Sequence, residues 1–359
     1  MLLINEPLST VARSVHVLGG IPTEGVRRGI DRIREVLPVR PFAEFVGAMA
    51  SEGPQVGVLL PPYIETSQLV EDWEGCGYLA RRLGGSARIG NVVTVVDSER
   101  MGEQLESGDP ISAYGWGKSA RDVRTVADIA VGQIESATHL VLVGASHSCD
   151  VVSRLITALN PSAARLTLDD TSDEGLREFL TGFRRSRDSG DTDASAQIVP
   201  PWLDLLRAES PAPWAPNRFL YRRSRPFDPE RFRNWLADAP RELVRGKGNV
   251  WLANQCDQSF GYSCAGAVHR LFAAGRWWAS CGESTWPTCD TARRRLLERW
   301  HPHFGDRRQE IAFVGLDHDP EAICSALDSC LLSEEEAFDA VLPSSLRAGP
   351  SASTRVGLH

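Results

Sequence analysis

Lysine is almost absent from this chain of 359 residues, although 39 of its residues are lysine or arginine. Only Lys118 and Lys247 are present, so nearly all positive charge is carried by arginine. A phosphate loop of the form G-x-x-x-x-G-K-[ST] needs a lysine that reaches the β- and γ-phosphates of a nucleotide. The scarcity of lysine therefore leaves two positions at which such a loop can be sought.

Closely spaced cysteines and long apolar runs are also missing. The eight cysteines form no C-x-x-C pair, which is the usual sequence sign of a structural zinc site. No apolar run approaches the ~20 residues of a membrane-spanning helix. The first residues show no basic segment leading into an apolar one, so we expect no signal peptide. These absences predict a cytoplasmic protein with reduced thiols and no membrane partner.

The net charge of -8 is unevenly distributed along the chain. Residues 215–310 carry sixteen Arg and one Lys against ten acidic residues, a balance of +7. Residues 311–359 carry two Arg against eight acids, a balance of -6, and the remaining -9 lies in residues 1–214. A basic module inside an acidic protein is a better guide to partners than the total charge.

The first half alternates short β-branched runs with helical patterns, which predicts a parallel α/β sheet domain over residues 1–183. Strands are predicted at Val15–Leu18, Val56–Leu60, Asn91–Val96, His139–Val143 and Ala164–Leu168. Helices are predicted at Glu24–Leu37, Phe42–Ala50, Gln68–Leu83, Ala120–Ser136 and Asp150–Leu159. Ser119 is the predicted N-cap of the fourth helix, because its hydroxyl can accept from an orphan N–H.

The polar and proline-rich stretch 184–216 is predicted to be a flexible linker. A smaller α/β domain follows over residues 217–342, and residues 343–359 are predicted to be a disordered tail. Within the second domain we expect a strand, a helix from Asp228, several strands up to Trp278, a helix at Thr291–Trp300, a strand at Glu310–Gly315 and helices up to Val341.

Four segments of the second domain, residues 219–232, 245–253, 275–279 and 305–315, resemble in order the C-terminal domain of the CobW family. The resemblance covers about 120 residues. Proteins of this family are GTP-binding and handle metals, so the resemblance implies that the first domain is a P-loop GTPase domain. It also implies a link to metal supply, most often to zinc shortage.

The predicted first strand and helix are placed like a phosphate loop, but most of its chemistry is missing. Gly20 and Gly25 keep the glycine spacing, while Val26 stands at the lysine position and Arg27 at the Ser/Thr position. Arginine has no acceptor and cannot coordinate Mg²⁺, and Glu24 adds a negative charge beside any phosphate. Gly20 and Gly25 are therefore interpreted as a vestigial phosphate loop, and the domain as a degenerate GTPase domain.

Other GTPase elements implied by the resemblance are absent as well. Gly117-Lys118-Ser119 has Ser112 where the first glycine belongs, and it follows a turn instead of a strand. The strand ending at Val143 leads into Gly144-Ala145-Ser146 in place of the Asn-Lys-x-Asp that selects guanine. The family's acidic Mg²⁺ residue and Cys-x-Cys-Cys metal motif are also missing. Asp97 matches a family position, but it is equally interpretable as a helix cap.

A metal site is a weaker hypothesis for the second domain. His301 and His303 lie close in sequence, with Cys281 and Cys289 upstream, and Cys256 or Cys264 as a further ligand. Zinc accepts mixed Cys and His ligands, but the spacing is wider than in usual structural sites. The alternative is that the histidines are exposed and the cysteines buried, and we expect no resident cofactor.

Basic residues of the second domain are the predicted partner-binding residues. They are Arg222, Arg223, Arg225, Lys247, Arg293, Arg294 and Arg295. Arginine suits bidentate contacts with phosphate or carboxylate, so ribosomal RNA is a possible partner and DNA is not expected. The alternative is that they form charged faces that keep the protein in solution.

Three hypotheses of function follow. The first is a non-catalytic CobW-like adaptor of the zinc-limitation response. Resemblance to one bacterial branch of the family implies that such an adaptor binds the small ribosomal subunit and recruits a hibernation factor. The second is a GTP-dependent zinc metallochaperone or insertase. The third is a metal-binding or metal-sensing protein that uses the scattered Cys and His. No catalytic motif with a nucleophile and base is identified, which favours a protein that is not an enzyme.

Overall fold

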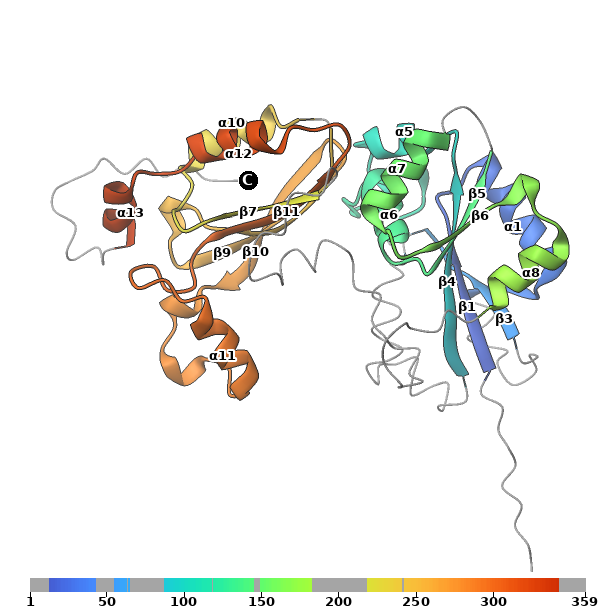
Figure 1. The fold of residues 1–359 in the computed structure, drawn as a ribbon, viewed down its shortest axis with the longest axis horizontal. Helices are drawn as coiled ribbons and strands as arrows, with labels where there is room; N and C mark the ends of the chain where they lie inside the picture. The colour runs from blue at the N-terminus through green and yellow to red at the C-terminus, as the bar shows by residue number, and fades with distance from the viewer. Residues whose placement is uncertain are drawn as a thin grey trace, which may run out of the picture.

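The computed structural model describes residues 13–42, 55–62, 64, 87–117, 119–144, 149–182, 218–240 and 242–341, which fold around two β-sheets (Figure 1). The first sheet has strand order β2-β3-β1-β4-β5-β6, and its strands pair in parallel. The second is antiparallel, with order β10-β9-β8-β11-β7. This arrangement confirms the predicted fold class, whereas the predicted linker and tail lie outside the described residues.

The first domain is a parallel sheet with helices on both faces. Its elements are β1 (Arg13–Gly19), α1 (Glu24–Val36), β2 (Val39–Pro41), β3 (Gln55–Leu59), β4 (Ala87–Asp97), α5 (Met101–Glu106), α6 (Val126–Glu135), β5 (His139–Val143), α7 (Cys149–Leu159), β6 (Ala164–Thr167) and α8 (Asp173–Thr181). Helices α5, α6 and α7 cover one face and α1 and α8 the other (Figure 1). Every residue of β5 is buried for this reason, as its continuous apolar run indicates.

All five predicted strands of this domain are present, but the start of the fourth predicted helix was wrong. Helix α6 begins at Val126 and not at Ala120, and its N-cap is Thr125 instead of Ser119. Thr125 and Asp128 form a reciprocal capping box, which satisfies two backbone donors at once. The predicted helix Gln68–Leu83 lies outside the described residues, and so does the predicted helix Phe42–Ala50 apart from Phe42. Three elements of the structure, β2, α5 and α8, were not predicted from the sequence.

The second domain is an antiparallel sheet with α10 and α12 on one face and α11 on the other side (Figure 1). Its elements are β7 (Arg218–Arg223), α10 (Pro229–Ala237), β8 (Leu243–Val250), β9 (Gln258–Ala265), β10 (Val268–Arg276), α11 (Asp290–Glu298), β11 (Gln309–Gly315), α12 (Pro320–Ser329) and α13 (Glu334–Val341). An aromatic core fixes the helix-covered face, with Phe219, Tyr221, Phe232 and Phe313 all at most 1% exposed.

Helix α6 joins the two domains through buried charge and apolar contact. Arg245 of β8 binds Glu135, the last residue of α6, through Nε–Oε1 at 2.8 Å and Nη2–Oε2 at 3.1 Å. Arg270 of β10 pairs with Asp128 in the first turn of α6. Ala265 of β9 is fully buried in the same apolar cluster as residues of α6 and α7. The second domain is therefore fixed against the first through both ends of α6.

Candidate functional site

The two glycines predicted to form a vestigial phosphate loop, Gly20 and Gly25, lie at the turn between β1 and α1, where atoms of the chain approach both closely. Helix α1 begins at Glu24, and the Thr23 side chain caps it by accepting from the Val26 N–H at 3.0 Å. Val26 is 3% exposed and packs in the core. A Cβ added to Gly20 would lie 2.7 Å from Cγ1 of Val26. The residue at the lysine position therefore occupies the space beside Gly20.

An internal carboxylate lies against the N-terminus of α1. Asp97 ends β4 and is 7% exposed. The Thr23 hydroxyl donates to its Oδ2 at 2.7 Å, and a Cβ added to Gly25 would lie 2.4 Å from the same oxygen. A helix N-terminus favours negative charge, which is why nucleotide phosphates bind there in P-loop proteins. Here the Asp97 carboxylate lies beside the first turn of α1, and glycine at position 25 allows its close approach.

Asp97 also has the capping role that the sequence left open. Its Oδ1 accepts from the backbone N–H groups of Glu99 at 3.2 Å and Arg100 at 3.3 Å, just before α5. The Arg27 side chain at the former Ser/Thr position pairs with Glu24 on the exposed surface. Lys118 and residues 145–148 of the base-selecting loop lie outside the described residues.

The candidate metal ligands are not brought together. The His301 Nδ1 accepts from the backbone N–H groups of His303 and Phe304 at 3.2 and 3.3 Å, and the ring stacks on Phe304. The two histidine rings lie 5.9 Å apart, while Cys281 follows a short 3₁₀ turn and the exposed Cys289 precedes α11. In the part of the chain that the structure describes, no three His, Cys, Asp or Glu residues are grouped to hold a metal ion.

The predicted partner-binding residues are spread over the second domain. Arg222 and Arg223 end β7, while Arg225 donates to the Leu332 carbonyl at 2.7 Å. Lys247 lies in the middle of β8, opposite Ala312 of β11. Arg293, Arg294 and Arg295 belong to α11, and the Arg293 guanidinium lies over the Trp286 ring at 5.7 Å from its centroid. Two residues of this set, Arg222 and Arg223, line a common cavity.

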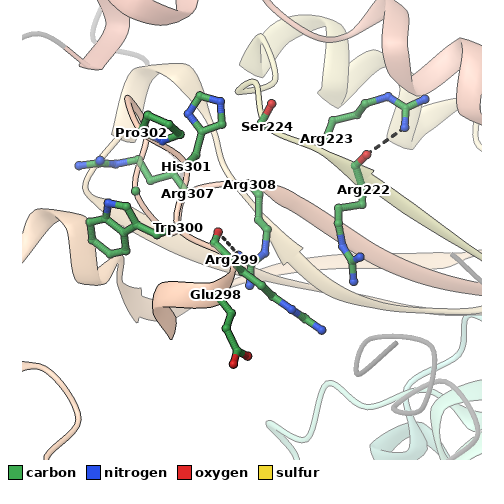
Figure 2. Close-up of a pocket in the computed structure, with 11 residues that line it drawn as sticks. Arg222, Arg223, Ser224, Glu298, Arg299, Trp300, His301, Pro302, Arg307 and Arg308 are labelled. Carbon is green, nitrogen blue, oxygen red and sulfur yellow. Dashed lines mark hydrogen bonds between the residues drawn. The ribbon is translucent and has the colours of Figure 1, made fainter. Parts of the chain in front are cut away.

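That cavity, here called the arginine pocket, has a volume of about 530 Å³ (Figure 2). It lies between the end of β7, the end of α11 and the loop that leads to β11. Its lining residues are Arg222, Arg223, Ser224, Glu298, Arg299, Trp300, His301, Pro302, Gly305, Arg307 and Arg308. Five guanidinium groups therefore gather in one small region of the basic domain.

A nearly buried carboxylate organises three of these arginines. Glu310 of β11 has a side chain that is 7% exposed and accepts from Arg222 at 2.8 Å. Arg299 donates to the same oxygen at 3.4 Å, and Arg308 donates to the other oxygen at 3.2 Å. Figure 2 shows the three arginines converging from β7, from the end of α11 and from the start of β11. Their guanidinium orientations are thus set before any ligand binds.

The other two arginines of the pocket have structural partners. Arg223 makes a bidentate pair with Asp328 of α12, at 2.8 Å for both bonds. Arg307 is 7% exposed and donates to the carbonyl groups of Cys256 and Phe304. These two guanidinium groups form walls of the pocket and hold it to the rest of the domain.

Several residues of the pocket were not predicted from the sequence. Arg299, Arg308 and Glu310 were not singled out, although the excess of arginine in residues 215–310 included the first two. A basic pair directly before a buried strand, as in Arg307-Arg308, was a usable signal. Arg308 lies only two positions before Glu310, but the other two partners of this carboxylate, Arg222 and Arg299, come from β7 and the end of α11 and gave no local sign.

Comparison with known proteins places the chain in a family. Residues 217–331 match the cobalamin synthesis protein cobW C-terminal domain. The chain is 28% identical over 265 residues to Zinc-regulated GTPase metalloprotein activator 1 of Dictyostelium discoideum, covering 69% of this chain and 53% of that protein. It is 30% identical over 289 residues to Zinc chaperone Rv0106 of Mycobacterium tuberculosis, covering 79% of this chain and 68% of that protein. The chain thus spans about half the length of the first relative.

A solved structure, the Zn(II)-bound YjiA GTPase from E. coli, is similar at 12% sequence identity and a TM-score of 0.34, covering 89% of this chain and 99% of that one. Within the described ranges, no helix combines the length and apolar content needed to cross a membrane. The match of the second domain and the 30% identity over two thirds of the mycobacterial relative show that the chain belongs to the CobW family.

Proposed function

We propose that this chain is an adaptor of the zinc-limitation response that binds a macromolecular partner without using GTP. The observation that carries the proposal is the filled turn between β1 and α1. Val26 occupies the space beside Gly20, and the Asp97 carboxylate lies against Gly25. A P-loop holds phosphates with backbone N–H groups and a lysine. Here valine stands at the lysine position, and its backbone N–H donates to the Thr23 hydroxyl.

The Mg²⁺ ligand of a phosphate loop is missing as well. Arg27 cannot replace the Ser/Thr hydroxyl that holds Mg²⁺, because a guanidinium group has no acceptor. The lack of this ligand and of the lysine opposes nucleotide binding in the first domain.

The zinc context of the proposal comes from the relatives. Their names describe a zinc-regulated GTPase metalloprotein activator and a zinc chaperone. In this chain the basic second domain is the proposed contact surface, since arginine matches the phosphate groups of ribosomal RNA. We therefore extend the proposal to the small ribosomal subunit as the partner, with recruitment of a hibernation factor as the purpose.

The first experiment measures GTP binding by calorimetry in the presence of Mg²⁺. We expect no magnesium-dependent binding at tens of micromolar protein. A matched pair of variants tests whether any GTP binding occurs at the start of α1. Gly25→Ala disturbs this region, whereas Gly132→Ala adds a methyl group where no atom lies within 4 Å. Sub-micromolar, magnesium-dependent binding that Gly25→Ala abolishes would contradict the proposal.

The second experiment measures co-sedimentation with purified small ribosomal subunits between ~50 and ~200 mM salt. Phosphate contacts release counterions, so the affinity should fall steeply over this range. Replacing Arg293, Arg294 and Arg295 together with Glu should weaken binding by about 2 kcal/mol or more. Replacing Arg27, Arg28 and Arg34 of α1 with Glu is the control with the same change of charge. Salt-insensitive binding, or equal losses in both triple variants, would argue against the proposed surface.

The second candidate function is a GTP-dependent zinc chaperone, which the names of the relatives favour. It requires nucleotide turnover and zinc transfer to a client protein. Zinc binding coupled to GTP hydrolysis in the purified chain would establish this function over the adaptor. Stoichiometric zinc that His301→Ala with His303→Ala removes would instead support the metal-binding hypothesis.

A further inference from the structure

The arginine pocket has the size and the charge of a ligand site. Its volume of about 530 Å³ falls within the ~300–1,000 Å³ range of small-molecule sites. Five guanidinium groups line it, against the one carboxylate of Glu298 in the same lining. When the carboxylates that pair with these arginines, Glu310, Asp328 and Asp257, are included, the balance is one positive charge. An anionic ligand would match this balance.

The three arginines around Glu310 are suited to a tetrahedral oxyanion. Their side chains are 25%, 30% and 23% exposed for Arg222, Arg299 and Arg308, so each has part of its surface open to the pocket. Each guanidinium group presents N–H donors in a fixed plane. Because the shared carboxylate already fixes these planes, a ligand oxyanion would bind without the full entropic cost of ordering three long side chains.

The pocket also has an aromatic wall. Trp300 is half-buried and packs against Trp286, with ring centroids 4.8 Å apart. The turn at Gly305 has a φ of 68°, and a Cβ there would lie 3.1 Å from the Trp300 ring. The indole is thus held in place by its neighbours. A bare ion would leave this wall and most of the volume unused, whereas an organic phosphate with a flat ring would use both.

We propose that the arginine pocket binds a phosphate monoester that carries a flat ring, with the phosphate on Arg222, Arg299 and Arg308 and the ring on Trp300. This inference deepens the proposed function, since it assigns a ligand chemistry within the same basic domain. The inference rests on the proposed function in one respect, because both treat the second domain as a binding surface.

The test uses the full-length chain and calorimetric titration with adenosine monophosphate and with inorganic phosphate. We expect 1:1 binding of the nucleotide, with a weaker affinity for inorganic phosphate because the latter has no ring. Arg308→Gln should reduce both affinities about ten-fold or more, the usual loss for one charge-assisted contact. Glu310 keeps Arg222 and Arg299 as partners in this variant, so the fold should persist.

Arg233→Gln is the matched control, because Arg233 is exposed on α10 and does not line the pocket. It makes the same change of charge and should leave both affinities unchanged. Absence of nucleotide binding at millimolar concentration, or an equal loss in Arg233→Gln and Arg308→Gln, would overturn the inference. If the melting temperature of Arg308→Gln falls, Arg222→Gln provides the same comparison from β7.

Trp300→Leu separates the two parts of the ligand. It should remove the preference for the nucleotide and leave the affinity for inorganic phosphate unchanged. Equal affinities for the two ligands in the unaltered chain would refute the aromatic part of the inference. Competition by a short oligoribonucleotide with a 5′-phosphate then distinguishes the two sources of the phosphate monoester. If the oligoribonucleotide displaces the nucleotide, the ligand is the end of an RNA; if it does not, the ligand is a free small molecule.

The two proposals fail in different ways. GTP also carries phosphates and should enter the arginine pocket weakly, without needing Mg²⁺. Magnesium-dependent GTP binding that survives Arg308→Gln would contradict the proposed function and leave the pocket inference intact. Failure of adenosine monophosphate to bind would overturn the inference and leave the proposed function intact.

Discussion

The ion pair between Arg245 and Glu135 gives the sharpest stability prediction, because it is buried and joins the two domains. The two side chains are 6% and 5% exposed. Glu135→Ala would leave a buried guanidinium group hydrogen-bonded to two neutral groups, the Ser263 hydroxyl and the Cys264 carbonyl, with the carboxylate of Asp128 as a charged neighbour. Removing one partner of a buried pair costs about 3–5 kcal/mol. This is a large part of the roughly 5–15 kcal/mol that holds a typical domain folded.

The assay is urea unfolding followed by tryptophan fluorescence and circular dichroism. We expect Glu135→Ala to lower the unfolding midpoint strongly and to let the two domains unfold in separate transitions. The double variant Glu135→Leu with Arg245→Met should recover most of the loss, because well-packed apolar residues often replace a buried pair at little cost. Asp31→Ala is the surface control, since its pair with Arg34 is about half exposed and should contribute less than about 1 kcal/mol.

Two results would refute this reasoning. One is a loss below about 1 kcal/mol in Glu135→Ala, which would mean that the pair is solvated or that the domains separate easily. The other is a double variant no more stable than the single one, which would mean that α6 and β8 are held together by the charges themselves and not by the apolar contacts around them.

Further predictions concern the filled turn, a buried thiol and a buried imidazole. Gly25→Ala should cost about 1–3 kcal/mol in urea unfolding, because the new methyl group meets Asp97, whereas Gly132→Ala in α6 should gain up to about 1 kcal/mol. Burial raises the pKa of the Cys264 thiol to about 11, so at pH 8 iodoacetamide should label Cys264 only after unfolding, as mass spectrometry can check. Burial lowers the pKa of His269; the unfolded chain therefore binds a proton first as the pH falls below about 6.5. Stability should then fall by at most about 1.4 kcal/mol per pH unit between pH 6.5 and 5.5, and His269→Gln should reduce this slope in urea unfolding.

Local patterns in the sequence predicted most of the first sheet. The run His139–Val143 has the bounds of β5, because a strand covered on both faces must be apolar throughout. Helix α1 begins at Glu24 as predicted, since its cap and its apolar stripe are local properties. The start of α6 was missed even though Thr125 and Asp128 carry a local capping signal.

The contacts that build the pocket could not be predicted in this way. Arg222 and Glu310 lie 88 positions apart and meet because β7 and β11 are neighbours in the second sheet. Arg299 and Arg308 reach the same carboxylate from the end of α11 and the start of β11. Strand order and register determine which side chains converge, and neither is encoded in any short stretch of sequence.

The first domain shows the same division. The sequence alone determined that the phosphate loop lacks its lysine and its hydroxyl, because Val26 and Arg27 occupy those positions. Only the tertiary structure decided which side chains lie against Gly20 and Gly25. Strand β4 lies parallel to β1, with Gly19 opposite Thr94, so both strands end at the same edge of the sheet. That adjacency brings Asp97 to Thr23, 74 positions away in the chain, and places its carboxylate at the start of α1.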